Sequence, residues 1–190
     1  MQTVDFFTPI VDDPYVYGQI AAANAVSDIY AMGGRPLTAL RDRRRFRRTG
    51  STPTTIRAIF RGGFDKLREA GVVAARRPHG AGSRNQVRLR GHRRDRSGRA
   101  CSPTPARSAG DVLFLTKPLG TGIVGTAIKF DRVDRRWPTR RCASMRTLNR
   151  AAAEALQALP AGAVHACTDV TGFGLHRARH RDGAGERGDA

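Results

Sequence analysis

The chain has 190 residues and a formal net charge of +18 at pH 7. Such a charge is typical of proteins that bind nucleic acid or an anionic membrane surface. No run of about 18 apolar residues occurs, so we expect no membrane span, and the acidic start without an apolar core predicts no signal peptide. The three cysteines, Cys101, Cys142 and Cys167, lack a C-x-x-C spacing, which argues against a disulfide scaffold and favours the cytoplasm.

The positive charge is built almost entirely from arginine. Only three of the 34 basic residues are lysines, and most arginines lie in four clusters, at 41–48, 76–107, 132–141 and 177–187. Residues 76–107 contain no aromatic residue on which a base could stack, and Gly and Pro interrupt any long helix. The composition therefore argues against an evolved nucleic-acid interface.

The first half of the chain shows clear element signals. Residues 3–12 predict a strand, ended by an Asp-Asp-Pro turn. The Ala-rich stretch 18–32 predicts a helix closed by a Gly-Gly pair, and apolar residues at helical spacing predict a second helix over 53–70. Residues 71–75 then predict the start of a buried strand.

The second half repeats this alternation. Residues 111–116 predict a strand, and a turn leads to a helix that begins at about 123. A further helix is predicted over 144–159, and 164–175 predicts a strand that leads into a Gly-rich turn. Alternating strands and helices indicate an α/β or α+β fold.

Three carboxylates stand out as candidate functional groups. Asp28 lies late in the first predicted helix, on one face with Asn24 and beside the small residues Ala21 and Ala25. A carboxylate is disfavoured near a helix C-terminus, so Asp28 is either solvated there or functional. Asp5 lies within a predicted strand, where an acid is costly unless it faces solvent or a ligand.

Asp169 precedes the Gly-rich turn, where the backbone can approach a phosphate or a metal ion. Asp5, Asp28 and Asp169 could together hold Mg²⁺, which prefers hard oxygen ligands, although spacing leaves open whether they converge. Cys167 faces the same side of the predicted strand and is interpreted as a small buried filler. Lys117 could touch a phosphate, but its segment lacks a Walker A pattern and favours a plain turn.

Four segments of the chain resemble one enzyme family in the same order. Residues 3–40, TVDFFTPIVDDPYVYGQIAAANAVSDIYAMGGRPLTAL, resemble the ATP-binding region of selenophosphate synthetases (selenide, water dikinases). GDVLFLTKPLGTGI, SMRTLNRAAAEAL and CTDVTGFGL resemble later segments, and together the four cover slightly more than half of the chain. That family belongs to the aminoimidazole ribonucleotide synthetase-like superfamily of homodimeric α+β proteins.

The resemblance implies a site and a reaction. Asp5 and Asp28 would lie at the ATP site, and Asp28 and Asp169 would be among the Mg²⁺ ligands. The implied reaction converts ATP, selenide and water into selenophosphate, AMP and phosphate. The family's reactive Cys or selenocysteine and its neighbouring Lys would lie upstream of this chain. We therefore expect no catalytic residue within the chain and no activity from it alone.

Two alternatives stay open from the sequence. Another ATP-using member of the superfamily, of the thiamine-monophosphate kinase or aminoimidazole ribonucleotide synthetase type, is disfavoured by the segments DFFTPIVDDP and TDVTGFGL. An Arg-rich nucleic-acid-binding protein is the other alternative.

The resemblance stops where the arginine clusters begin. After AGVV the family has a strand and a Gly-Gly-His turn that reaches the nucleotide, whereas this chain has AARRPHGAG. A shifted reading frame in a GC-rich gene explains both features, because CGN codons then yield Arg without Lys. Shifting 76–80 by one base permits Gly-Gly-His-Thr. We therefore predict that 41–52, 76–108 and 176–190 are poorly ordered.

The predicted architecture is an α+β, aminoimidazole ribonucleotide synthetase-like two-domain fold, incomplete at both ends. An ATP-binding domain covers 1–108 and is disrupted at 41–52 and 76–108. The start of a second α+β domain covers 109–190 and is disrupted near 132–142 and after 175.

Overall fold

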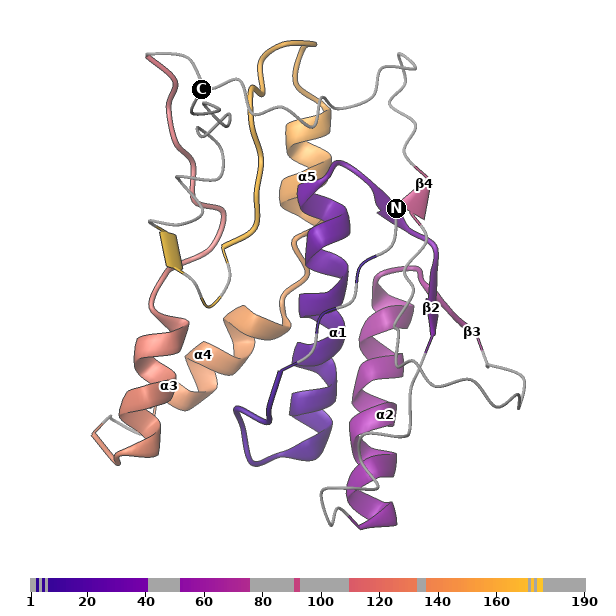
Figure 1. Ribbon diagram of the computed structural model, residues 1–190, viewed down its shortest axis with the longest axis vertical. Coiled ribbons are helices and arrows are strands. Elements are labelled where there is room, and N and C mark those ends of the chain that lie inside the picture. The colour runs from indigo at the N-terminus through magenta and orange to yellow at the C-terminus, as the bar shows by residue number, and fades with distance from the viewer. Residues whose placement is uncertain are drawn as a thin grey trace, which may run out of the picture.

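A computed structural model describes residues 3, 5, 7–40, 52–75, 91–92, 110–132, 136–170, 172 and 174–175. The elements in chain order are α1 (Pro14–Ala31), β1 (Arg35–Pro36), β2 (Thr38–Leu40), α2 (Pro53–Glu69), β3 (Val73–Ala75), β4 (Gly91–His92), α3 (Thr121–Lys129), α4 (Arg136–Arg146) and α5 (Arg150–Gln157) (Figure 1). The predicted α+β class is confirmed.

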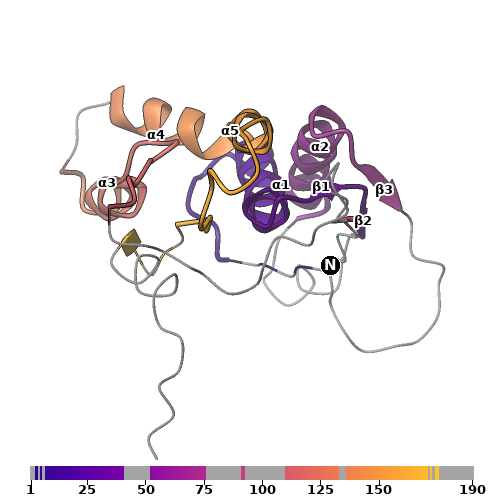
Figure 2. The same ribbon diagram turned by 90° about the horizontal axis from the view of Figure 1, so that it is seen from above.

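Helix α1 is the centre of this arrangement. It packs against α2 on one side and against α4 and α5 on the other, as the two views show (Figures 1 and 2). The hydrophobic core forms along it and takes in residues from β2, the end of α2 and α5: Ala25, Val26, Ile29, Tyr30, Ala39, Ala70, Val72 and Ala153. No described helix is both long enough and apolar enough to cross a membrane.

Helix α1 begins one turn earlier than the sequence predicted. The Asp13 carboxylate accepts hydrogen bonds from the backbone N–H groups of Tyr15 and Val16, at 2.8 and 3.2 Å, and Pro14 occupies the first turn. The Asp-Asp-Pro turn that we interpreted as the end of a strand is therefore the N-cap of this helix. The helix ends as predicted, with Gly33 at a φ of 69°.

Helix α2 confirms the prediction over 53–70. Thr52 caps it by accepting from the Thr55 N–H at 3.2 Å, and Gly71 follows it with a φ of 72°. The two long helices cross at glycines. A Cβ on Gly18 would lie 2.0 Å from the Ile59 carbonyl oxygen, and one on Gly62 the same 2.0 Å from that of Tyr15. Only glycine allows the backbones to approach this closely.

The described residues include four short strands, which form two pairs. Strands β2 and β3 are parallel, with Thr38 opposite Val73, and β1 is antiparallel to β4, with Arg35 opposite His92. The strand predicted from 71 is confirmed as β3, but its burial is not, because Val73 is 66% exposed.

Strand β4 lies inside the segment 76–108, for which we predicted poor order. Its pairing with β1 supplies the backbone hydrogen bonds that a strand requires. The remaining residues of that segment, with 41–51 and 176–190, lie outside the described part of the chain.

Three predicted strands are wrong over their described residues. The stretches 7–12, 111–115 and 164–170 have no regular secondary structure. Their apolar pattern indicates a preference for a sheet, but a strand also requires a neighbouring strand to pair with. The run Val112–Leu115 illustrates this, since its four apolar side chains are 53–80% exposed.

The helix predicted over 144–159 is divided into α4 and α5 by a break at 147–149. Helix α4 also extends into the segment near 132–142 that was expected to be disrupted. Arg141 in that helix is buried and donates hydrogen bonds to the carbonyl oxygens of Thr121 and Ile10, at 2.9 and 3.0 Å. Helix α3 confirms the helix predicted after the turn at 117–120.

Candidate functional site

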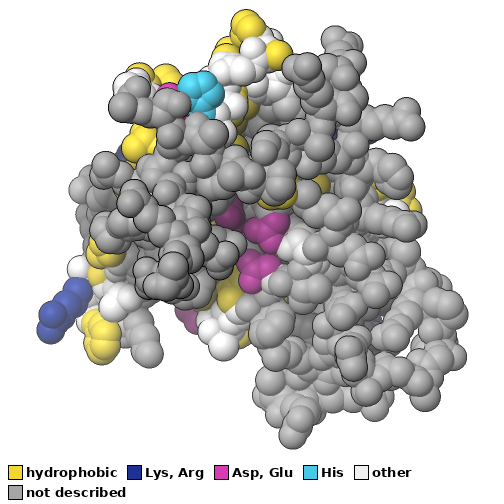
Figure 3. All heavy atoms as spheres, turned by 45° about the horizontal axis from the view of Figure 1, so that its top comes forward, with side chains coloured by type: hydrophobic (Ala, Val, Ile, Leu, Met, Phe, Trp, Pro, Cys, Tyr) yellow, Lys and Arg dark blue, Asp and Glu magenta, His cyan; other side chains and the backbone are white. Residues whose placement is uncertain are grey.

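The three carboxylates singled out from the sequence converge beside the middle and the end of α1. Asp28 is on α1, Asp5 is on the irregular segment before it, and Asp169 is on the irregular segment after α5. All three are partly buried. Figure 3 shows acidic side chains gathered in a hollow near the middle of one face of the molecule.

Helix α1 holds this cluster through residues four positions apart. Asn24 donates from Nδ2 to a carboxylate oxygen of Asp5, and Thr3 donates from Oγ1 to a carboxylate oxygen of Asp28. Asn24 and Asp28 lie on one face of α1, as their spacing predicted. Ala25, which lies beside them on the helix, is buried in the core.

The pKa of the Asp169 carboxyl lies above its usual range. Burial is the first cause, because it disfavours the charged form. The second is Asp28, through its negative charge and through a hydrogen bond between the two carboxyl groups, and the charge of Asp5 adds to them. The neutral form of the Asp169 carboxyl is therefore favoured beside Asp28 more than it would be in water.

The carboxylates of this cluster fit a cation whose remaining ligands are phosphate oxygens and water. No group of three or more His, Cys, Asp or Glu side chains within the described ranges is arranged to hold a metal ion by itself. Magnesium in nucleotide sites is usually held by one or two carboxylates together with phosphate oxygens and water. The Asp28–Asp169 pair provides two such carboxylates.

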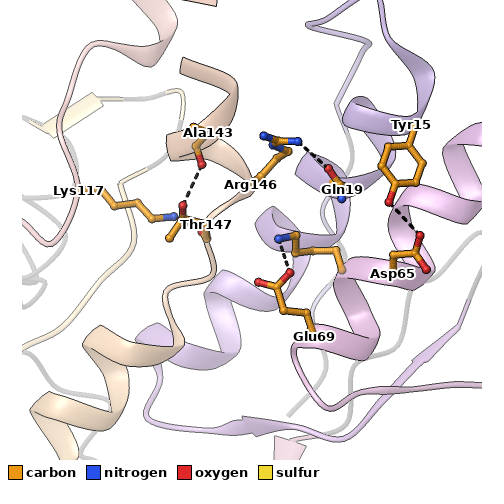
Figure 4. Close-up of polar contacts among 9 residues, drawn as sticks. Tyr15, Gln19, Asp65, Glu69, Lys117, Ala143, Arg146 and Thr147 are labelled. Carbon is orange, nitrogen blue, oxygen red and sulfur yellow. Dashed lines mark hydrogen bonds and ion pairs between the residues drawn. The ribbon is translucent and has the colours of Figure 1, made fainter. Parts of the chain in front are cut away.

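Two further predictions concern residues beside this cluster. Cys167 is exposed, so its interpretation as a buried filler is wrong. Lys117 donates from Nζ to the carbonyl oxygen of Thr147 (Figure 4), which supports the turn interpretation over a phosphate contact. The pKa of Lys117 is lowered, first by burial and then by the charge of Lys66.

Sequence reasoning missed the residues that hold the cluster in place. Thr3 received no role, because its partner Asp28 lies 25 residues further along the chain. His165 was also missed, and its Nδ1 lies 2.7 Å from Oδ1 of Asp111, which joins the segment of Asp169 to the segment 110–120. A pair 54 residues apart in the chain gives no local signal.

The fold and the cluster together define a class: an α+β protein with a carboxylate site to which separate parts of the chain contribute. The chain matches the AIR synthase related protein family over two stretches, the N-terminal domain at residues 1–75 and the C-terminal domain at 108–181. The chain belongs to the AIR synthase related protein family. Asp5 and Asp28 fall in the first stretch and Asp169 in the second.

Several curated relatives are named selenide, water dikinase. The relative from Pelobacter propionicus is 45% identical over 175 residues, which are 92% of this chain and 49% of that protein. The relatives from Clostridium botulinum (strain Eklund 17B / Type B) and Geobacter metallireducens are 43% and 44% identical over 92% and 97% of the chain. The resemblance stated from the sequence is confirmed. The chain spans about half the length of these relatives.

Proposed function

We propose that this chain belongs to a selenide, water dikinase, which makes selenophosphate from ATP, selenide and water and releases AMP and phosphate. The relatives named selenide, water dikinase, at 43–45% identity over at least 92% of the chain, carry the proposal. The convergence of Asp5, Asp28 and Asp169 supports it, because phosphoryl transfer uses metal ions that neutralise phosphate charge, and carboxylates bind such ions.

In this proposal Asp5 and Asp28 lie at the ATP site, and Asp28 and Asp169 bind Mg²⁺. When bound, Mg²⁺ would neutralise the charge of the phosphates during transfer. Asn24 and Thr3 would fix the orientation of Asp5 and Asp28, so that their oxygens point toward the ion and the nucleotide. A bound cation would favour the charged form of Asp169, since it would offset the repulsion from the carboxylates beside it.

The proposal includes a cytoplasmic homodimer. The exposed apolar run Val112–Leu115 supports self-association, because contiguous exposed apolar surface is a mark of an interface. Light scattering on the purified chain should give twice the monomer mass, and a monomer at high concentration would contradict this part.

Binding of ATP in the presence and absence of Mg²⁺, measured by calorimetry, tests the site. We expect Asp28→Asn to weaken Mg²⁺-dependent ATP binding by about tenfold or more, in line with the loss of a charged partner worth about 1.5–3 kcal/mol. Glu154→Gln is the matched control, since Glu154 is exposed on α5 and pairs only locally with Arg150 among the described contacts. Equal ATP affinity with and without Mg²⁺, or an Asp28→Asn variant that binds like the parent, would overturn the assignment.

A further inference from the structure

The carboxylate cluster depends on how two parts of the chain dock. Asp5 and Asp28 belong to the stretch that matches the family's N-terminal domain, and Asp169 belongs to the stretch that matches its C-terminal domain. Their contact therefore requires α5 and the segments around it to sit on α1 in one register. Apolar packing alone tolerates small shifts along a helix, whereas a hydrogen bond between buried groups does not.

The side chain of Asn149 makes an unusual hydrogen bond where α5 meets α1. Asn149 is the N-cap residue of α5, a position where Asn normally accepts a hydrogen bond from the second or third helical N–H group. Its side chain makes no such cap bond. It donates instead from Nδ2 to the Oγ of Ser27 at 2.7 Å, across 122 residues of sequence. Ser27 is buried, 8% exposed, and directly precedes Asp28 on α1.

The surroundings of this bond tie it to the core and to Asp169. Leu148 packs on the core cluster and Ala153 belongs to it, so the bond lies at the edge of the apolar contact between α5 and α1. On the other side, the Thr147 carbonyl accepts from Lys117 (Figure 4). Lys117 lies in the segment 110–120, which the contact of Asp111 with His165 joins to the chain four residues before Asp169.

We propose that Asn149 is a positioning residue, whose hydrogen bond to Ser27 fixes α5 on α1 in the register that brings Asp169 to Asp28. The inference rests on the proposed function in one respect, because the cluster that it positions is the proposed Mg²⁺–ATP site. Asn149 itself touches neither nucleotide nor ion. Its side chain bonds to Ser27 instead of capping α5. In this way it sets the distance between the carboxylates of Asp28 and Asp169, which lie on other segments.

Two variants test this role through ATP binding. Asn149→Leu keeps nearly the shape of the side chain and removes the donor, and Ser27→Ala removes the acceptor with less effect on packing. We expect each to reduce the Mg²⁺ enhancement of ATP affinity by about fivefold to tenfold while ATP affinity without Mg²⁺ stays the same. The double variant should lose no more than either single one, since both remove the same bond. Glu154→Gln, exposed on the same helix, should leave the enhancement unchanged.

A second readout uses no nucleotide and so separates this inference from the proposed function. A nitroxide label on exposed Cys167, with Cys101 and Cys142 replaced by Ser, should broaden the amide signals of residues 26–30 of α1 in NMR spectra. We expect that broadening to weaken in Asn149→Leu and in Ser27→Ala, with α1 and α5 still folded. Unchanged broadening in both variants overturns the inference, whether or not the parent chain binds ATP. If the parent shows no Mg²⁺-dependent binding but the broadening weakens in both, only the proposed function fails.

Discussion

Asp169 shows how neighbouring carboxylates of like charge change the pKa of a carboxyl group. Its carboxyl is partly buried and shares a hydrogen bond with Asp28, and both effects raise its pKa. In an unfolded chain the same group would titrate near pH 4. The folded protein therefore binds this proton more tightly than the unfolded chain does, which links the stability of the fold to pH.

The sign of that linkage gives a testable pH dependence. The contribution of Asp169 to stability is fully present below its unfolded pKa and is lost as the pH rises through its raised folded pKa. Without Mg²⁺, the melting temperature of the parent chain should therefore fall relative to that of Asp169→Asn between pH 4 and pH 8. The comparison with the variant removes the large pH effect of the arginine-rich chain as a whole. Melting curves recorded by circular dichroism give both series.

At the upper end of this pH range, addition of Mg²⁺ should reverse the fall in the melting temperature of the parent chain. In the proposed site Mg²⁺ would bind the charged form of Asp169, so about 10 mM Mg²⁺ should raise the melting temperature of the parent near pH 8 and leave Asp169→Asn nearly unchanged. A difference between parent and variant that stays constant across the whole range would contradict the linked titration.

At the scale of elements, helices α1 and α2 cross closely because Gly18 and Gly62 lie at the crossing, rather than because of a stripe of apolar side chains. Gly62 lies under the Tyr15 carbonyl, and a Cβ there would approach the oxygen to 2.0 Å. Gly63 is its neighbour on the same helix, where a Cβ would lie 3.4 Å from the Gly18 carbonyl oxygen, an ordinary contact. The two positions are adjacent on the same helix, and glycine at either one carries the same helix propensity. They differ in the space that is available to a Cβ.

Gly62→Ala should therefore destabilise the chain, whereas Gly63→Ala should not. Forcing the helices apart costs about 1–3 kcal/mol or more, which exceeds the gain of about 1 kcal/mol that Ala brings to a helix interior over Gly. In Gly63→Ala only the gain remains, so its free energy of unfolding should be equal to or above that of the parent. Urea denaturation of the three chains measures this, and equal stability of both variants would show that the helices can separate without cost.

The sequence predicted elements with local signals and failed where an element depends on a partner. Helix α2 and the end of α1 were predicted because caps, glycine stops and helical spacing are local. The start of α1 was missed because Asp13 suits both a turn and an N-cap. The strands predicted at 3–12 and 111–116 were wrong over 7–12 and 111–116, which the structure describes. Apolar, β-branched residues show a preference for a sheet but do not identify the strand that pairs with them.

The candidate site followed the same division. Asp5, Asp28 and Asp169 were found from their unfavourable local positions and from the family resemblance, and their convergence is visible only in three dimensions. Asn149 and Ser27 were missed because both suit ordinary roles, a helix cap and a small helix residue. The exposure of Cys167 was missed because period-two alternation assumes a strand that does not form there.

At the scale of the whole molecule, the segments that carry the positive charge differ in composition from the segments that form the core. The residues that form the core and the carboxylate cluster lie in segments with ordinary composition, whereas most of the +18 charge comes from arginines at 41–48, 76–107, 132–141 and 177–187. These clusters contain no lysine. A surface evolved to bind phosphates uses both cations, since each neutralises a phosphate. A shifted reading frame in GC-rich DNA remains our explanation for the difference.

Resequencing the coding DNA across codons 35–190 tests that explanation. We expect single-base insertions or deletions whose correction replaces the arginine runs with apolar strands and restores a Gly-Gly-His turn near residue 79. The corrected protein should convert ATP to AMP and phosphate only when selenide is present, which phosphorus NMR follows directly. A confirmed frame would contradict the hypothesis, and the arginine clusters would then belong to the protein as it is made. In that case the salt dependence of binding to single-stranded DNA would distinguish a nucleic-acid role, because each phosphate contact steepens it.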